Sequence, residues 1–249
     1  MASVSPAWIG AEAWRAGSAL KRAGLAGRRI EAPFPLWLVT VPDALDADLV
    51  ACLDRAENAR AHRFSTAFLS RRYLAAHGAL RVLGEYYFGV PAARQRYVPN
   101  AFGKPCLHGI AGSVSGAQCS ISYSRGAILV AWSADGDIGV DVETVRPIAD
   151  AADLVTLHCT AAEQAALKAA GPLTDLGFLS VWVRKEACMK ALGKGFACPP
   201  SSFDCGVGHG LGSGFGTCAV EIEGHHMDCG NYDLKGDLAV AWARLRLAG

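Results

Sequence analysis

The chain has 249 residues, of which 51% are hydrophobic and 19% are charged, and its formal net charge is +1. This composition is typical of a globular protein that can bury a large core, and it excludes a disordered chain or one with a global attraction to nucleic acid. The longest apolar runs, such as residues 127–132, are too short to cross a bilayer, and no signal-peptide pattern opens the sequence. We therefore expect a cytoplasmic protein that binds neither membrane nor nucleic acid.

The nine cysteines are odd in number and include no Cys-x-x-Cys pair, so we expect reduced, partly buried thiols. His225, His226 and Cys229, with Cys218 nearby, leave a metal site open as an alternative. Structural zinc sites usually show tighter paired spacing, which makes this alternative the weaker one.

The first third of the chain predicts one strand and two helices. Residues 1–35 are rich in Ala, Gly and Arg and predict a loosely helical lead-in without an assignable function. Residues 36–41 favour a strand, residues 46–61 favour a helix, and residues 65–89 carry the longest helical pattern. Arg72 lies in this last helix, where it is either an ordinary exposed arginine or a contact for an anion.

A turn and a hairpin follow. Residues 100–105 predict a turn, because Pro105 fixes its own backbone and biases Lys104 toward an extended conformation. A lysine on such a turn is a plausible contact for a phosphate or a nucleotide, although it could also be simply solvated. Residues 120–133 are typical of a hairpin that bends at residues 125–126.

The next stretch, residues 137–143, alternates strictly and predicts a strand with Gly139, Asp141 and Glu143 on one face. Two carboxylates at i and i+2 repel each other unless a positive charge lies between them, and a hard divalent cation such as Mg²⁺ is the usual solution. The alternative is an exposed acidic strand edge that discourages aggregation. Gly139 indicates that something bulky approaches closely, which favours a metal together with a phosphate.

Residues 160–170 predict a short helix. Thr160 and Glu163 form a capping-box pattern at its start, which is enough to explain Glu163 structurally. After residue 199 the chain becomes glycine-rich and strand-like, and it ends with a strand candidate at residues 237–246.

Residues 178–192 predict a helix that is the centre of the sequence. Trp182, Lys185 and Glu186 fall at i, i+3 and i+4 and so share one side, and Lys190 follows Glu186 by four residues. On the simplest interpretation Trp182 is core and Glu186–Lys190 is a solvated ion pair. On the functional interpretation the two lysines and the carboxylate face a phosphate.

Five sequence elements decide between these interpretations. Gly139-Val-Asp-Val-Glu143 and Trp182-x-x-Lys-Glu-x-x-x-Lys190 resemble the two signature motifs of the Sfp-type 4′-phosphopantetheinyl transferases. Gly103-Lys-Pro105, Ile121-Ser-Tyr-Ser124 and Thr160-Ala-Ala-Glu163 are similar to three further elements of that family. The order and spacing of all five fit, across roughly residues 57–205.

The resemblance implies an α+β fold of two similar halves related by a pseudo-twofold axis, with the active site in the cleft between them. On this pattern residues 1–35 are the lead-in and residues 36–134 form the first half, which contacts the adenosine side of coenzyme A. Residues 135–249 form the second half, with the metal strand and the catalytic helix. One chain would then hold a complete site, and we expect a monomer.

The resemblance also implies an activity. The chain would transfer the 4′-phosphopantetheine group of coenzyme A to a serine of an acyl or peptidyl carrier protein, with Mg²⁺, and would release 3′,5′-adenosine bisphosphate. A divalent ion with lysines suits this reaction, because negative charge builds on the leaving phosphate. The implied metal ligands are Asp141, Glu143 and Glu186, and the implied catalytic residues are Glu186, as candidate base, and Lys190. The implied coenzyme A contacts are Arg72, Lys104, Pro105, Ser122, Tyr123, Lys185 and Lys190.

Tyr123 departs from the family pattern, which usually has histidine at this position. The phenol either keeps part of the contact with a coenzyme A phosphate or points into the core, in which case Arg125 is the next candidate. Two other functions stay open on the sequence alone. One is a different Mg²⁺-dependent phosphoryl or nucleotidyl transferase, and the other is a non-catalytic module that binds coenzyme A or a carrier protein and would tolerate the loss of Asp141 or Glu143.

Overall fold

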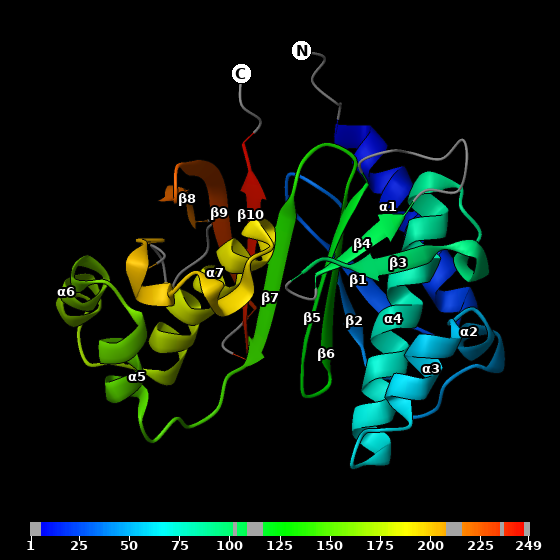
Figure 1. The fold of residues 1–249 in the computed structure, drawn as a ribbon, viewed down its shortest axis with the longest axis horizontal. Helices are drawn as coiled ribbons and strands as arrows, with labels where there is room; N and C mark the ends of the chain where they lie inside the picture. Colours follow the sequence, from blue (N-terminus) through cyan, green and yellow to red (C-terminus); the bar gives the residue numbers. More distant parts are fainter. Residues whose placement is uncertain (1–5, 102–103, 109–116, 208–215, 235–236, 247–249) are drawn as a thin grey trace.

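The computed structural model describes residues 6–101, 104–108, 117–207, 216–234 and 237–246. Two four-stranded antiparallel sheets lie between two groups of helices, α1–α4 on one side and α5–α7 on the other (Figure 1). The α+β class predicted from the sequence is confirmed. Among the helices of the described segments, none is long and apolar enough to cross a membrane.

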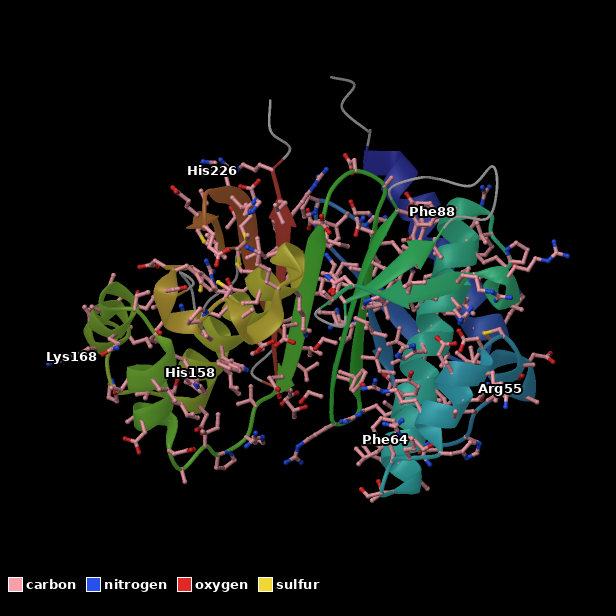
Figure 2. The ribbon with its side chains drawn as sticks, viewed as in Figure 1. Arg55, Phe64, Phe88, His158, Lys168 and His226 are labelled. Carbon is pink, nitrogen blue, oxygen red and sulfur yellow. The ribbon has the colours of Figure 1, made fainter. Side chains whose placement is uncertain are left out.

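The first sheet has the strand order β1-β2-β6-β5, and two long helices cover it. Its elements are α1 (Pro6–Arg22), β1 (Ala26–Ile30), β2 (Leu36–Thr40), α2 (Ala47–Ala51), α3 (Arg55–Ala61), α4 (Ala67–Phe88), η1 (Ala92–Arg94), β3 (Arg96–Pro99), β4 (Pro105–His108), β5 (Gln118–Ser124) and β6 (Ala127–Ser133). Strands β3 and β4 form a separate two-stranded hairpin. In Figure 2, the labelled Phe88 is the last residue of α4, and the labelled Phe64 lies three residues before its start.

The second sheet has the strand order β7-β10-β9-β8. Its elements are β7 (Ile138–Thr144), α5 (Ala151–His158), α6 (Ala161–Ala169), α7 (Asp175–Leu192), η2 (Gly195–Ala197), η3 (Pro200–Ser202), β8 (Gly216–Ile222), β9 (His225–Asp233) and β10 (Leu238–Leu245). Strand β7 pairs with β10, so the strand predicted to carry the acidic residues is an edge strand of this sheet.

Three hydrophobic clusters hold these layers together. One lies between α1, α4 and the first sheet, and another lies between α7 and the second sheet. The third lies between the two sheets and contains Ile138, Val140 and Val142 of β7. Alternation along a strand sends neighbouring side chains to opposite faces, so Gly139 and Asp141 point toward α7. The predicted division of this strand into an apolar and an acidic face is confirmed.

Serine hydroxyls join the edge strands of the two sheets. The backbone N–H of Val140 in β7 donates to Ser120 Oγ at 3.0 Å, and that of Thr144 donates to Ser124 Oγ at 3.1 Å. Strands β5 and β7 belong to different sheets, so side-chain oxygens replace part of a backbone ladder here. This seam places the end of the first sheet beside the acidic face of β7.

Two predicted elements differ from the structure. The expected helix over residues 46–61 is divided into α2 and α3, because Asp54 and Glu57 form a capping box that starts a new helix. Within residues 6–35, α1 and β1 form more than a lead-in, since β1 pairs along β2 and Leu20 of α1 is fully buried. Most of β1 is exposed, but its last residue, Ile30, is buried, so this stretch packs on the first sheet.

The remaining predicted elements are found close to their expected places. The hairpin β5–β6 bends at residues 125–126, and the predicted capping box at Thr160 and Glu163 starts α6. The helix expected over residues 178–192 begins three residues earlier, because Thr174 accepts a hydrogen bond from the backbone N–H of Gly177. Seven of the described cysteines are free thiols, namely Cys52, Cys159, Cys188, Cys198, Cys205, Cys218 and Cys229.

Candidate active site

Helix α7 and strand β7 meet backbone to backbone, and Gly139 makes this contact possible. A Cβ atom at this position would lie 2.0 Å from the carbonyl oxygen of Ala187 and 2.4 Å from the backbone nitrogen of Ala191. Gly139 was predicted to mark the close approach of something bulky, and the approaching group is α7 itself. The contact brings the acidic face of β7 against the last two turns of α7.

Asp141 is the best-connected carboxylate of this region, with only 5% of its surface exposed. One of its oxygens, Oδ1, accepts hydrogen bonds from Lys190 Nζ at 2.6 Å and from Ser122 Oγ at 2.7 Å. The three residues come from β7, α7 and β5. The structure therefore brings together three of the predicted site residues, Asp141, Lys190 and Ser122.

Glu143 and Glu186 complete a group of three carboxylates. Glu143 accepts a hydrogen bond from Ser124 Oγ at 2.7 Å. Burial, together with the negative charges of Asp141 and Glu143, raises the pKa of Glu186 to about 7 against the opposing effect of Lys190. The ionisation of Glu186 therefore depends on the charges of the two other carboxylates, as expected for members of one site.

The chemistry of this group suits a hard cation, because carboxylate oxygens are the ligands that Mg²⁺ prefers. Within the residues that the structure describes, however, no group of three or more His, Cys, Asp and Glu side chains is already arranged around a metal position. The ammonium group of Lys190 lies on Asp141 and supplies the positive charge there. The carboxylate oxygens are ligands of the kind that Mg²⁺ prefers. In this arrangement the ammonium group of Lys190 occupies part of the space that the ion would take. The same finding gives no support to a metal site at His225, His226, Cys218 and Cys229.

A cavity of about 500 Å³ lies next to these carboxylates. Most of its wall comes from α3, α4, β3, β4 and β5, and Lys190 of α7 also lines it. Four residues predicted to bind coenzyme A line it, namely Pro105, Ser122, Tyr123 and Lys190. A volume of this size lies within the usual range for small-molecule sites.

Arg72 lies beside the cavity wall. Its guanidinium carbon is 4.8 Å from the centre of the Tyr123 ring and 5.9 Å from the centre of the Phe68 ring. The Nε atom of Arg72 is buried, and no residue in the described segments gives it a hydrogen-bond partner. Arg125, the alternative to Tyr123, is exposed at the bend of the β5–β6 hairpin, in a left-handed conformation with a φ of 46°.

Lys104 connects the turn before β4 to Asp137, just before β7, and to the end of α7. Its amine donates to Asp137 Oδ1 at 2.8 Å and to the carbonyl oxygen of Ala191 at 3.4 Å. The preceding turn makes a second connection, since Asn100 Nδ2 donates to the carbonyl oxygen of Gly193 at 2.9 Å. Gly103 of this turn lies outside the described residues. Lys104 is thus held at the end of α7, close to the site but paired with Asp137.

Lys185 is the predicted phosphate contact that the structure places elsewhere. Its side chain is fully buried, and its amine pairs with Glu163 Oε2 at 2.8 Å. The amine also donates to the carbonyl oxygens of Pro200 and Phe203 at 2.7 and 2.8 Å. An ammonium group has three donors, so all three are used inside the protein. Sequence spacing had put Lys185 beside Glu186, but consecutive helical residues point about 100° apart, and here they face different surroundings.

Four residues of the site were missed by sequence reasoning. Ser124 could have been found, because it alternates with Ser122 on the same strand face. Glu57, Arg60 and His77 line the cavity but belong to helices whose packing the sequence does not reveal. Burial would raise the pKa of Glu57, yet hydrogen bonds from His77 and from a buried arginine of α4 outweigh it and lower the pKa to about 2.

Comparison with known proteins gives consistent matches. The sequence model of the 4′-phosphopantetheinyl transferase superfamily matches residues 137–223, which include β7 and α7. The chain is 33% identical over 168 residues to 4′-phosphopantetheinyl transferase HetI of Nostoc sp., covering 65% of this chain and 69% of the relative. It is 28% identical over 145 residues to 4′-phosphopantetheinyl transferase ffp of Bacillus subtilis, covering 54% of this chain and 55% of that relative.

Proposed function

The chain belongs to the 4′-phosphopantetheinyl transferase superfamily, and from this premise we propose the reaction that its site performs. The phosphopantetheine group of coenzyme A is transferred to a serine of an acyl or peptidyl carrier protein, and 3′,5′-adenosine bisphosphate is released in an Mg²⁺-dependent step. The observation that carries the proposal is the position of Asp141. It lies against Lys190 and Ser122 beside a cavity of about 500 Å³.

The proposed site lies in a cleft between two similar halves related by a pseudo-twofold axis. Each half has a four-stranded antiparallel sheet covered by a long helix, α4 in the first and α7 in the second, which supports this arrangement. Lys190 of the second half closes a cavity whose other lining residues come from the first half. Both halves belong to one chain, so we propose that a monomer holds a complete site. We also propose that the protein is cytoplasmic.

Asp141, Glu143 and Glu186 are the proposed ligands of Mg²⁺, which when bound neutralises the phosphate oxygens and favours departure of the leaving phosphate. Ser122 and Ser124 orient the first two carboxylates by donating to them. Lys190, with 30% of its side chain exposed, lines the cavity and is the proposed cation for a coenzyme A phosphate.

Glu186 is the proposed base for the hydroxyl of the carrier serine. It lies one helical turn before Lys190 on α7, so both side chains point to the same side of that helix. A base at this place takes the proton as the serine oxygen attacks the β-phosphorus of coenzyme A and the bond to the adenosine bisphosphate breaks.

Arg72, Lys104, Pro105, Ser122 and Tyr123 are the proposed contacts of the adenosine side of coenzyme A. Pro105, Ser122 and Tyr123 support this assignment by lining the cavity. Lys185 is left out of the set, because its amine is enclosed.

The reaction is tested by incubating apo forms of several carrier proteins with the protein, coenzyme A and Mg²⁺. Intact-mass spectrometry should show the mass gain of one phosphopantetheine group on the carrier. Asp141→Asn and chelation of Mg²⁺ with EDTA should each abolish the gain, while Asp153→Asn, at an exposed carboxylate of α5, should leave it unchanged. Full activity of Asp141→Asn in EDTA would contradict the metal assignment, and no gain on any carrier would contradict the reaction.

A further inference from the structure

We infer that Tyr123 acts through Arg72, as a positioning residue whose aromatic ring holds the guanidinium group ready for a phosphate of coenzyme A. The inference rests on the proposed function. It differs from the expectation that the phenol hydroxyl touches the phosphate itself.

The environment of Arg72 is the first reason. Its guanidinium group lies over the ring of Tyr123 at 4.8 Å and near the ring of Phe68 at 5.9 Å. In the described part of the chain, its Nε atom has no hydrogen-bond partner, and no carboxylate forms an ion pair with it. Arg72 is therefore a cation that aromatic rings hold in place while its donors stay uncommitted.

The second arginine of interest on α4, Arg81, shows what a structural arginine looks like here. It is fully buried, and its guanidinium group donates to the carboxylates of Glu57 and Asp54 and to the carbonyl oxygens of Ala92 and Gln95. Its charge is neutralised and its donors are used. Arg72, nine residues earlier on the same helix, has both its positive charge and its hydrogen-bond donors available for a ligand.

An aromatic ring suits this task better than a carboxylate does. A carboxylate would fix the guanidinium group by taking its donors and cancelling its charge, and a phosphate would then have to compete with it. A ring attracts the flat face of the cation and leaves the N–H groups at its edge free. A planar guanidinium held in this way is arranged in advance to bind a phosphate through two parallel hydrogen bonds.

The position of Tyr123 connects this pair to the site. Tyr123 follows Ser122, which donates to Asp141, and it lines the cavity that Lys190 closes from the other half. Coenzyme A carries a phosphomonoester at one end of its nucleotide and a pyrophosphate at the other. Lys190 and Arg60, which line the cavity, and the ring-supported Arg72 beside it supply positive charge for that distribution of negative charge.

The test measures the Kd of coenzyme A by calorimetry in Mg²⁺ buffer without a carrier protein. Tyr123→Phe keeps the ring and should bind within about twofold of the parent, whereas Tyr123→Leu should bind about 3- to 30-fold more weakly, the range of a cation–π contact. Tyr86→Leu removes a half-buried tyrosine elsewhere on α4 and should leave the Kd unchanged. Phe68→Leu, at the more distant ring, should weaken binding less than Tyr123→Leu and serves as a second variant should the latter fold poorly.

A double-mutant cycle decides how the ring acts. If Tyr123 works through Arg72, then Arg72→Gln combined with Tyr123→Leu should bind coenzyme A no more weakly than Arg72→Gln alone. Additive losses in the double variant, or a Tyr123→Phe variant as weak as Tyr123→Leu, would overturn the inference in favour of direct contact by Tyr123. Since the assay needs no carrier, failure of carrier modification with these binding results intact would contradict the reaction and not the positioning role.

Discussion

Replacing Lys185 by methionine tests whether this lysine stabilises the second half or contacts substrate. The change keeps most of the side-chain volume but leaves the carboxylate of Glu163 buried without its cation. Breaking a buried ion pair by removing one partner costs about 3–5 kcal/mol. In a protein of this size each kcal/mol corresponds to about 2–4 °C in Tm, so we expect Tm to fall by about 6–20 °C.

The assay combines thermal unfolding with transfer kinetics measured well below the Tm of the variant. Because the Lys185 amine is enclosed by Glu163 and two carbonyl oxygens, the folded variant should keep kcat and the KM for coenzyme A within a few-fold of the parent. Lys168→Met is the matched control, since Lys168 is exposed on α6, at the outer side of the molecule (Figure 2). A Lys185→Met protein with parental Tm and a rate reduced more than about 100-fold would show that the lysine acts on the phosphates.

Three further outcomes follow from the same geometry. Glu186→Gln should lower kcat by about 10² to 10⁴ with little change in the Kd of coenzyme A; a loss of kcat below tenfold would contradict the role of Glu186 as the base. Gly139→Ala should destabilise the protein by about 3 kcal/mol or more in urea unfolding, because backbone atoms of α7 cannot turn away from the new methyl group, whereas Gly126→Ala, which meets nothing within 4 Å, should be neutral. Glu57 has a folded pKa of about 2, below its usual 4.5, so its stabilising effect is complete above pH 4.5 and is lost as the pH falls toward 2. Glu57→Gln should therefore lower the free energy of unfolding by an amount on the order of 2 kcal/mol at pH 7 and by less at pH 3. An equal loss at both pH values would contradict the lowered pKa of Glu57.

Local patterns predicted the elements of the second half well. Strict alternation located β7 and its two faces, and the capping box located the start of α6. These signals work because the side-chain periodicity of a strand and the capping of a helix end depend on neighbours only a few residues away. The three carboxylates and Lys190 could be proposed for the same reason, since they belong to two short motifs.

What the sequence could not give depends on partners that are distant along the chain. Lys185 and Glu186 are adjacent, yet one pairs with a residue 22 positions earlier and the other faces β7. The ring of Tyr123 meets an arginine 51 positions earlier. No sequence periodicity encodes such long-range contacts, because they form when whole helices and strands pack together. The pairing of β1 with β2 also depends on packing of this kind.

Asp141 Oδ1, on the second sheet, is one atom at which the first sheet and α7 meet, since it accepts from Ser122 of β5 and from Lys190 of α7. A ligand that draws Lys190 away from this oxygen changes the charge at the carboxylate that Ser122 binds, and this hydrogen bond helps to join the two sheets. The free energy of ligand binding is thereby linked to the free energy of holding the two sheets together, and such linkage is reciprocal. The stability measured by unfolding and the ligand affinity measured by titration then depend on the same few contacts.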